Sequence, residues 1–279
     1  MATPEEIRER WSGASGPPDW ETVLADGLAL RHESGIAGDH RFSYGPDSFH
    51  ISADAGTVLC SVERPDDPRG QRQLLDTILF SVSFANGYEL LHASAVEIDD
   101  AVVAFIAPTG GGKSSIAAEL RRRGHRIFCD DVLAIGRSSQ EPICHPGPAV
   151  MSIPSAGSLV TSLGASVIAR FENEDEVWVE LKDAAVTPRA LRSVYLVDRH
   201  ADSCFASRVA TATVLDLLPH AISLVHDAAR ARQRFDLFSA LVDGIEIFRL
   251  GADRTASPSA VADLVQSSLE DLDHSLVAR

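Results

Sequence analysis

A glycine-rich loop near the middle of the chain constrains the fold more than any other feature. Residues 110–114 read Gly-Gly-Gly-Lys-Ser, after an apolar run at 101–106 and before a segment, 114–123, that has apolar residues on one helical face. A buried strand, a glycine loop and a helix in this order are typical of the loop that holds nucleotide phosphates in α/β proteins. The glycines let the backbone approach the phosphates, and the helix start adds the positive end of its dipole. The sequence therefore predicts a phosphate-binding loop between a strand and a helix.

The loop also supplies the side chains that a nucleotide and Mg²⁺ require. We expect Lys113 to contact the β- and γ-phosphates and Ser114 to bind Mg²⁺. The usual motif begins with Gly, whereas this chain has Ala107 there, so a glycine turn without a ligand is the alternative interpretation. The predicted cofactors are ATP and Mg²⁺. The residues expected to bind the nucleotide are Pro108, Thr109, Gly110, Gly111, Gly112, Lys113, Ser114 and Ser115.

Two adjacent acids follow the next predicted strand, at 126–129. Asp130 and Asp131 lie seventeen and eighteen positions after Lys113. The carboxyl ends of parallel strands face one crevice of an open sheet, so we expect the acids to lie near the loop. One carboxylate can anchor Mg²⁺ while the other accepts the proton of an attacking hydroxyl. The alternative is that the pair caps a turn. His92, twenty-one positions before Lys113, is a lone strand histidine, for which a structural role is the usual one.

The remaining segments predict a mixed α/β fold in two parts. Residues 1–87 combine turn formers, short alternating stretches and an amphipathic segment at 71–85, which predicts a smaller, mainly β accessory region with a helix. Residues 88–279 form the expected second domain. Its predicted elements are a β-hairpin at 90–106, strands at 126–129, 177–181, 193–197 and 245–250, and helices at 114–123, 210–225, 228–242 and 257–272. The strand, helix and strand at 101–129 predict a parallel unit with a right-handed crossover.

The composition limits the classes of binding partner and the location that we expect for the protein. The formal net charge of −15 argues against binding to nucleic acid or to an anionic membrane. No apolar run approaches the roughly 20 residues that cross a bilayer, and residues 1–11 lack a secretory signal, so we expect a cytoplasmic protein. The four cysteines, Cys60, Cys129, Cys144 and Cys204, are scattered without zinc-site spacing, which indicates reduced thiols.

Three motifs taken together resemble a known family. Leu-His-Ala-Ser-Ala-Val at 91–96, the loop through Ser114, and Arg-Gly-His-Arg and Cys-Asp-Asp within 123–131 are similar to the catalytic domain of the HPr serine kinase/phosphorylases and related P-loop kinases, including tailoring kinases of lasso peptides. That fold is shared with ATP-dependent phosphoenolpyruvate carboxykinase. The resemblance covers residues 88–135 clearly and continues to the C-terminus as a pattern of elements. It implies a P-loop kinase core of this type.

The resemblance also implies roles for particular residues. Asp131 would be the general base and Asp130 the partner on the metal side, while His92 would assist that base or the metal. With Lys113, these residues form the expected catalytic set. An arginine- and glycine-rich signature follows the paired acids in authentic HPr kinases, whereas residues 144–149 here read Cys-His-Pro-Gly-Pro-Ala. Recognition of HPr and the reverse phosphorylase reaction therefore do not follow from the resemblance.

The predicted activity is transfer of the γ-phosphoryl group of ATP to a hydroxyl acceptor. A serine of a protein or peptide is the acceptor by resemblance only. The alternatives are a small-molecule kinase and a regulatory module that binds a nucleotide without turnover. Lys182 and Arg189 are candidates for a further phosphate contact, although a surface role is preferred for each. The role of residues 1–87 and a homo-oligomeric state stay open.

Overall fold

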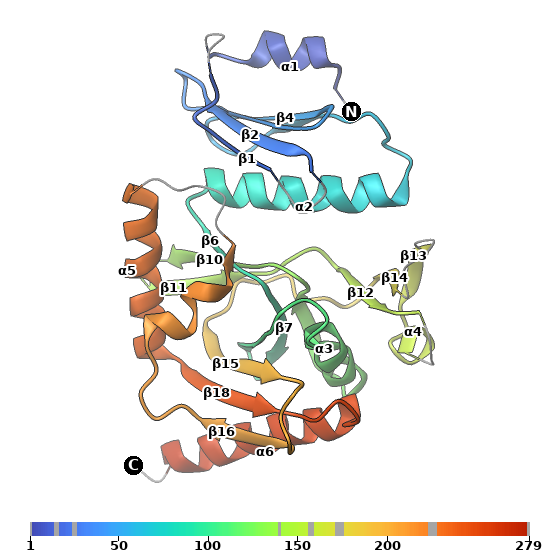
Figure 1. Ribbon diagram of the computed structural model, residues 1–279, viewed down its shortest axis with the longest axis vertical. Coiled ribbons are helices and arrows are strands. Elements are labelled where there is room, and N and C mark those ends of the chain that lie inside the picture. The colour runs from blue at the N-terminus through green and yellow to red at the C-terminus, as the bar shows by residue number, and fades with distance from the viewer. Residues whose placement is uncertain are drawn as a thin grey trace. The chain divides into compact units, whose positions relative to one another are not determined.

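Two compact units divide the chain in the computed structural model (Figure 1). The structure describes residues 2–13, 17–23, 27–138, 141–155, 159–170, 176–222 and 228–277. Unit 1 runs through Tyr88, and unit 2 begins at Glu89. This division falls one residue beyond the boundary expected between residues 87 and 88. The division into an accessory region at 1–87 and a P-loop kinase domain at 88–279 stays a prediction.

Unit 1 is a five-stranded antiparallel sheet with a helix on each face (Figure 1). Its strands lie side by side in chain order: β1 (Trp20–Val23), β2 (Ala29–Ser34), β3 (His40–Tyr44), β4 (Asp47–Ile51) and β5 (Val58–Ser61). Helix α2 (Pro68–Ala85) begins three residues before the predicted start, because the Asp67 carboxylate accepts a hydrogen bond from Gly70 N and Pro68 suits the first turn. Helix α1 (Pro4–Arg10) was not predicted, although Thr3 and Glu6 form a capping box at its start. The mainly β character expected of this region is confirmed.

A six-stranded sheet forms the centre of unit 2. Its strands, in spatial order, are β16 (Phe205–Arg208), β18 (Glu246–Gly251), β15 (Leu191–Asp198), β8 (Ala101–Ile106), β7 (Ala93–Ile98) and β9 (Arg126–Cys129). The strands β18, β15 and β8 are parallel, whereas β16 and β7 run against their neighbours. The mixed α/β class predicted for this region is confirmed.

The predicted strand–helix–strand unit needs one correction. Strands β8 and β9 run in the same direction and flank α3 (Lys113–Arg122) in the sequence, but β7 lies between them in the sheet. The cause is the tight hairpin of β7 and β8. Asp99 and Asp100 both adopt positive φ, at 50° and 61°, which is typical of the type I′ turn that joins two antiparallel strands. Because β7 takes the place beside β8, β9 pairs with β7.

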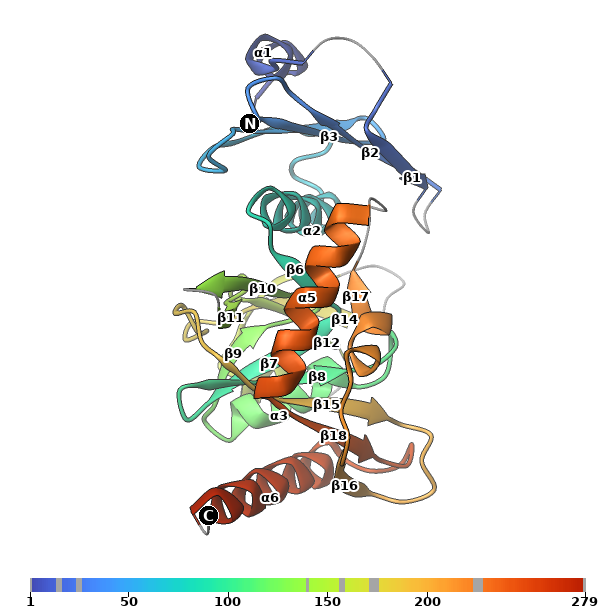
Figure 2. The same ribbon diagram turned by 90° about the vertical axis from the view of Figure 1, so that its left-hand side faces the viewer.

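Helices cover both faces of this sheet (Figure 2). Helices α3 and α6 (Pro258–Val277) pack on one face, where the Tyr195 ring stacks between Phe105 and Phe248 with centroid distances of 5.6 and 4.9 Å. Helix α5 (Ala228–Gly244) packs on the other face through Phe238 and its apolar neighbours. The α5 and α6 helices agree with those predicted at 228–242 and 257–272 to within a few residues. The phosphate loop therefore leaves the central strand of a two-sided core.

An ion-pair cluster links α5 to the strand before β7. The Glu89 carboxylate is buried, and it contacts Arg230 Nε at 2.8 Å and Arg234 Nε at 2.7 Å. Glu89 begins β6 (Glu89–Leu91), which belongs to a four-stranded sheet in the order β11 (Glu141–His145), β10 (Leu133–Ser138), β6, β17 (Ala221–Ile222). A buried acid with two cationic partners fixes where α5 meets this sheet.

A three-stranded sheet completes unit 2. It consists of β12 (Val150–Pro154), β14 (Glu176–Glu180) and β13 (Ser166–Arg170), and the one-turn helix α4 (Leu159–Ser162) lies between β12 and β13 in the chain. The strand predicted at 177–181 corresponds to β14, whereas β12 and β13 were not predicted. Residues of β12 and β14, Met151 and Val179 among them, join the core formed by α3 and α6.

The helix predicted at 210–225 is wrong. The chain instead forms two 3₁₀ turns, η1 (Val214–Asp216) and η2 (Leu218–His220), and then β17, while residues 223–225 lie outside the described residues. Asp216 accepts hydrogen bonds from the backbone and hydroxyl of Thr213, which stabilises a short turn. Pro219 lacks an N–H, so it cannot donate the hydrogen bond that would continue an α-helix through this segment. Local capping and one proline therefore override the apolar periodicity.

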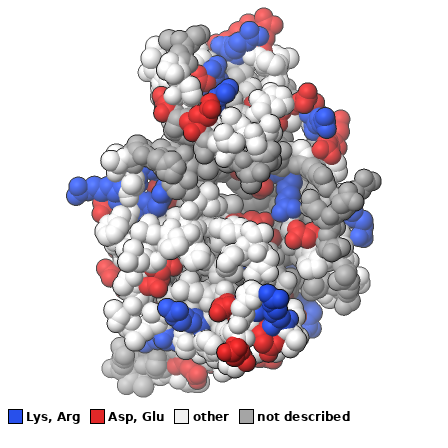
Figure 3. All heavy atoms as spheres, viewed as in Figure 1, with Lys and Arg blue, Asp and Glu red and all other residues white. Residues whose placement is uncertain are grey.

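Charged side chains are mixed on the face of the molecule that Figure 3 shows. Lys and Arg lie singly or in small groups among Asp and Glu over the described residues of this face. The excess of negative charge is therefore not gathered in one acidic patch there. None of the described helices combines the length and the apolar character needed to cross a membrane.

Candidate active site

The loop between β8 and α3 has left-handed backbone at two of its glycines. Gly110 and Gly112 have φ values of +76° and +87°, which favour glycine, and Gly112 caps the start of α3. Gly111 N donates a hydrogen bond to Pro108 O at 2.9 Å. A Cβ on Gly111 would lie 2.5 Å from the Cβ of Ala107. The buried Ala107 methyl therefore fills the space beneath Gly111, and the loop accommodates alanine where the usual motif has glycine.

Lys113 lies beneath this loop beside His92. Its Nζ donates to Ala107 O at 3.1 Å and lies 3.0 Å from His92 Nε2. His92 Nδ1 lies 3.0 Å from Asp131 O. A carbonyl only accepts, so we assign the ring proton to Nδ1, which leaves Nε2 to accept from the ammonium. Burial lowers the pKa of Lys113, while Asp131 and Asp130 act in the opposite direction. Two neutral acceptors thus hold the ammonium and leave its third N–H for an anion.

Asp130 connects the loop with two other strands. Its Oδ1 accepts hydrogen bonds from Ser94 Oγ at 2.5 Å and Ser114 Oγ at 2.8 Å, and its Oδ2 accepts one from Ser152 N at 3.0 Å. Burial and the neighbouring Asp131 raise the pKa of Asp130 to about 6, although these three donors oppose the shift. The ionised carboxylate is therefore costly in this environment, and a cation beside it would lower that cost.

The oxygens of Ser114 and Asp130 fit a magnesium site. Mg²⁺ is commonly bound by one or two carboxylates together with substrate phosphates and water. The described part of the chain contains no cluster of three or more His, Cys, Asp or Glu residues able to hold a metal ion.

Asp131 has an unusual backbone. Its φ is +64°, a left-handed conformation that non-glycine residues adopt rarely and at some cost. This conformation turns the chain directly after β9 and presents the Asp131 carbonyl to His92. Asp131 opposes the lowering of the Lys113 pKa and raises the pKa of Asp130, as a nearby carboxylate would. Its role as general base stays a prediction.

Some residues considered from the sequence lie outside this cluster. Arg189 pairs with Glu97 and with Asp100 in the β7–β8 turn, at the opposite end of the strands from the loop. A phosphate contact by Arg189 is therefore wrong. Lys182 is exposed, and His125 lies 3.3 Å from Gln266 of α6. Of the nucleotide-binding set, Pro108 and Thr109 are exposed and Ser115 is half-buried on α3.

Three residues near the cluster received no role from the sequence. Ser94 and Ser152 donate to Asp130, and the backbone carbonyl of His220 accepts a hydrogen bond from His92 N at 2.9 Å. Ser94 lies two positions after His92 on the same strand, a local signal that was available. Ser152 and His220 are brought in by long-range strand pairing, which no local pattern reveals.

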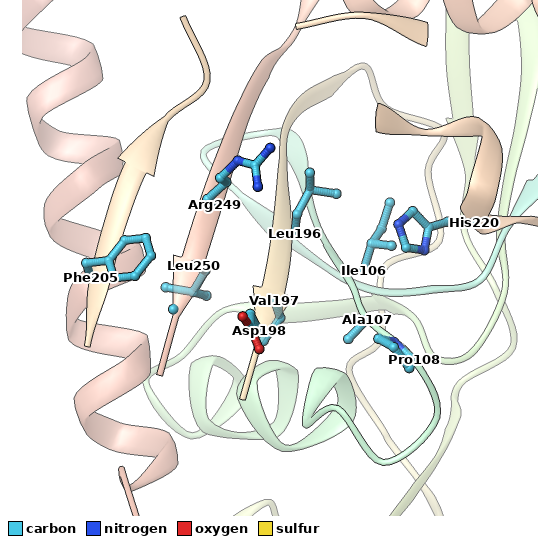
Figure 4. Close-up of a pocket in the computed structure, with 11 residues that line it drawn as sticks. Ile106, Ala107, Pro108, Leu196, Val197, Asp198, Phe205, His220, Arg249 and Leu250 are labelled. Carbon is cyan, nitrogen blue, oxygen red and sulfur yellow. The ribbon is translucent and has the colours of Figure 1, made fainter. Parts of the chain in front are cut away.

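A cleft of about 220 Å³ opens beside the loop, at the carboxyl ends of β8, β15 and β18 (Figure 4). This is the edge of a parallel sheet at which ligands usually bind. The cleft is mostly apolar, with three polar side chains. Its lining residues are Ile106, Ala107, Pro108, Leu196, Val197, Asp198, Phe205, His220, Arg249, Leu250 and Gly251.

Comparisons with known proteins point to one family. The chain is 32% identical over 68 residues to the HPr kinase/phosphorylase of Chlorobium phaeobacteroides, a match that covers 24% of this chain and 20% of the relative. It is 35% identical over 60 residues to that of Prosthecochloris aestuarii, covering 22% and 18%. It is 29% identical over 104 residues to HPr kinase/phosphorylase 1 of Oceanobacillus iheyensis, covering 32% and 34%. No protein-family model matches the chain.

A solved structure gives a weaker likeness. The HPr(Ser) kinase/phosphatase from Coxiella burnetii matches with a TM-score of 0.38 and 14% identity, over 68% of this chain and 95% of that one. The chain spans between 18% and 34% of the length of the curated relatives that it matches. The three sequence matches confirm the resemblance stated above: over the matched part, the chain is similar to the HPr kinase/phosphorylases.

Proposed function

We propose that this chain is an ATP- and Mg²⁺-dependent kinase that transfers the γ-phosphoryl group to a serine hydroxyl of a protein or peptide. The observation that carries the proposal is the 2.8 Å contact between Ser114 Oγ and Asp130 Oδ1. This contact joins the first turn of α3, directly after the glycine loop, to Asp130, the first of the two adjacent acids. A nucleotide on the loop would have its terminal phosphate facing those acids.

The residues divide the chemistry between them. The loop amides and the Lys113 ammonium would balance the charge of the transferring phosphoryl group, for which positioning and electrostatics supply most of the catalysis. Asp131 would accept the proton of the attacking hydroxyl. Ser114 and Asp130 would hold Mg²⁺, which when bound neutralises the phosphate oxygens. His92 would orient Lys113 and the turn at Asp131 through its two ring nitrogens.

The choice of acceptor rests on the relatives. The three curated matches are named HPr kinase/phosphorylases, and the family resemblance implies a serine of a protein or peptide. We therefore favour a protein hydroxyl as acceptor over a small molecule.

Transfer from radiolabelled ATP tests the proposal. The wild type, Asp131→Asn and the control Asp183→Asn would be incubated with Mg²⁺, HPr and a library of serine peptides. Asp183 is a suitable control because its side chain is 73% exposed. Loss of the base should lower the transfer rate about 10²- to 10⁴-fold while ATP binding persists, and the control should match the wild type. Wild-type protein that binds ATP tightly, yet neither transfers nor hydrolyses phosphate with any acceptor, would show the enzyme assignment to be wrong.

Lysine labelling gives an independent measure of nucleotide binding. The chain has only two lysines, Lys113 and Lys182. An acyl phosphate of ATP, which acylates lysines beside the phosphates, should modify Lys113, and free ATP should protect it. Lys182 serves as the internal reference, because it is exposed and should react slowly whether or not ATP is present. Equal labelling of both lysines, unaffected by ATP, would contradict binding at the loop.

A further inference from the structure

The cleft beside the loop lies on the side away from the paired acids. In the six-stranded sheet, β9 and its acids lie beyond β7 on one side of β8, whereas β15 and β18 lie on the other. We propose that this cleft binds the nucleoside half of the nucleotide, its aromatic base and ribose. The inference rests on the proposed function, because it assumes that the phosphates lie on residues 108–114.

The geometry of in-line transfer determines on which side of β8 the acceptor and the leaving nucleotide lie. The attacking hydroxyl and the leaving group must lie on opposite sides of the transferred phosphorus. The acids that would receive the acceptor's proton are on the β9 side. The leaving diphosphate and its nucleoside must then extend toward β15 and β18, where the cleft begins at Pro108.

The strand register builds the cleft floor from two rows of residues. Ile106, Leu196 and Arg249 are paired neighbours in one row. Asp198, Gly251 and Phe205 are paired in the next row. Directly paired residues project from the same face of a sheet, and so do residues two apart on one strand. All six therefore belong to one face.

The sides of the cleft differ in character (Figure 4). Arg249 and Phe205 lie on one side, and His220 and Pro108 on the other. A Cβ at Gly251 would overlap the Phe205 ring, so glycine at this position lets the ring lie against the strand. Phe205 remains 39% exposed, which leaves ring surface for a ligand. An aromatic ring beside an apolar floor suits a planar base.

Arg249 supplies the polar contact that such a base needs. Its guanidinium has no hydrogen bond or ion pair with any described residue, whereas its neighbours Arg192 and Arg208 pair with Asp273 and Glu246. A guanidinium can stack on an aromatic base or donate to its ring nitrogens and carbonyls.

Asp198 suits the ribose. It ends β15, and its Oδ1 already accepts a hydrogen bond from His200 N at 2.8 Å. The carboxylate retains further lone pairs toward the cleft mouth. Acidic side chains at the end of a parallel strand commonly bind ribose hydroxyls. The ligand would thus run from Phe205 and Arg249, past Asp198, to the loop.

Comparing ATP with inorganic tripolyphosphate separates the cleft from the loop. Calorimetric titration would give the Kd of each ligand, with Mg²⁺, for the wild type, Arg249→Ala, Phe205→Ala and the control Arg208→Ala. Arg208 pairs with Phe248, so it projects from the opposite face of the same strands and removes an equal charge. Thermal melting would show that each variant is folded.

The wild type should bind ATP more tightly than tripolyphosphate. Arg249→Ala and Phe205→Ala should each weaken ATP binding about tenfold and leave tripolyphosphate binding within about twofold. Arg208→Ala should change neither. Equal affinity of the wild type for the two ligands, or an equal loss of both in Arg249→Ala, would overturn the cleft assignment alone. Failure of the wild type to bind either ligand would overturn the proposed function as well.

Discussion

Replacing Asp130 with asparagine tests the electrostatics of the site, and the test does not require the phosphoryl acceptor to be known. The carboxyl pKa is raised from 3.8 to about 6, so the folded protein holds this proton more tightly than the unfolded chain does. A raised carboxyl pKa destabilises the fold above the unfolded value. The stability contributed by the protonated form is therefore lost as the pH rises from about 4 through about 6. An asparagine side chain does not titrate, so the variant should lack this part of the pH dependence.

The magnitude follows from the two pKa values. At pH 8 Asp130 is ionised in both the folded and the unfolded protein. A pKa shift of this size then lowers the unfolding free energy by about 3 kcal/mol. At pH 5.5 the protonated fraction of the folded protein recovers about 1 kcal/mol of it. The asparagine amide has one acceptor oxygen where the carboxylate has two, so it cannot accept both from the two serine hydroxyls and from Ser152 N, and the lost contact costs about 1–3 kcal/mol. This cost is the same at both pH values, so it cancels when the pH dependence of the two proteins is compared.

Urea denaturation in EDTA at pH 5.5 and pH 8 measures the effect. The lower pH stays above the sequence pI of about 5.0, where solubility would fall. Between these pH values the unfolding free energy of the wild type should fall about 1 kcal/mol further than that of Asp130→Asn. Added Mg²⁺ and ATP should stabilise the wild type and have little effect on the variant. An identical pH dependence of the two proteins would refute the raised pKa, because Asp130 would then be as well solvated folded as unfolded.

Three other substitutions give separate tests. Gly111→Ala places a Cβ 2.5 Å from that of Ala107, so the loop must shift; ATP affinity should fall at least about tenfold, with about 1–3 kcal/mol lost in urea denaturation. Glu89→Ala leaves two arginines of α5 without their buried acid and should lower the unfolding free energy by about 3 kcal/mol, whereas a loss below about 1 kcal/mol would mean that the cluster is well hydrated. Ser94→Ala removes a hydrogen-bond donor to Asp130, so the pKa of that carboxyl should rise further. The acid limb of the pH–rate profile should then move to higher pH, and an unchanged profile would exclude this contact from catalysis.

Elements with strong local signals could be predicted from the sequence. The β7–β8 hairpin follows from two apolar runs around an Asp-Asp turn, and α3 follows from the glycines before it. The start of α2 at Pro68 was equally readable, since Asp67-Pro68 is a helix-start pair, but apolar periodicity alone placed it later. In each case the deciding interactions are between residues close in the chain.

Strand order could not be predicted in the same way. The apolar pattern of 126–129 indicates a strand but not which strand it pairs with. This strand, β9, pairs with β7 because β7, the hairpin partner of β8, occupies the place beside β8. The same limit applies to the site, where Ser152 reaches Asp130 through a separate sheet. The proximity of His92 to Asp131 was expected only through the family resemblance, and spacing alone favoured a structural histidine.

The strand inserted between β8 and β9 sets the width of the reaction space. Adjacent strands lie about 4.8 Å apart, so the strand carrying the loop and the strand carrying the acids are separated by roughly 10 Å. Side chains span this distance, because Ser114 at the start of α3 and Ser94 of the middle strand both donate to Asp130, at 2.8 and 2.5 Å. Ser94 is the residue of this strand that faces the loop and the acids, and its side chain is among the smallest available, whereas Ala93 and Ala95 belong to the core on the α5 face. A leucine at position 94 would be expected to force the loop and the acids apart.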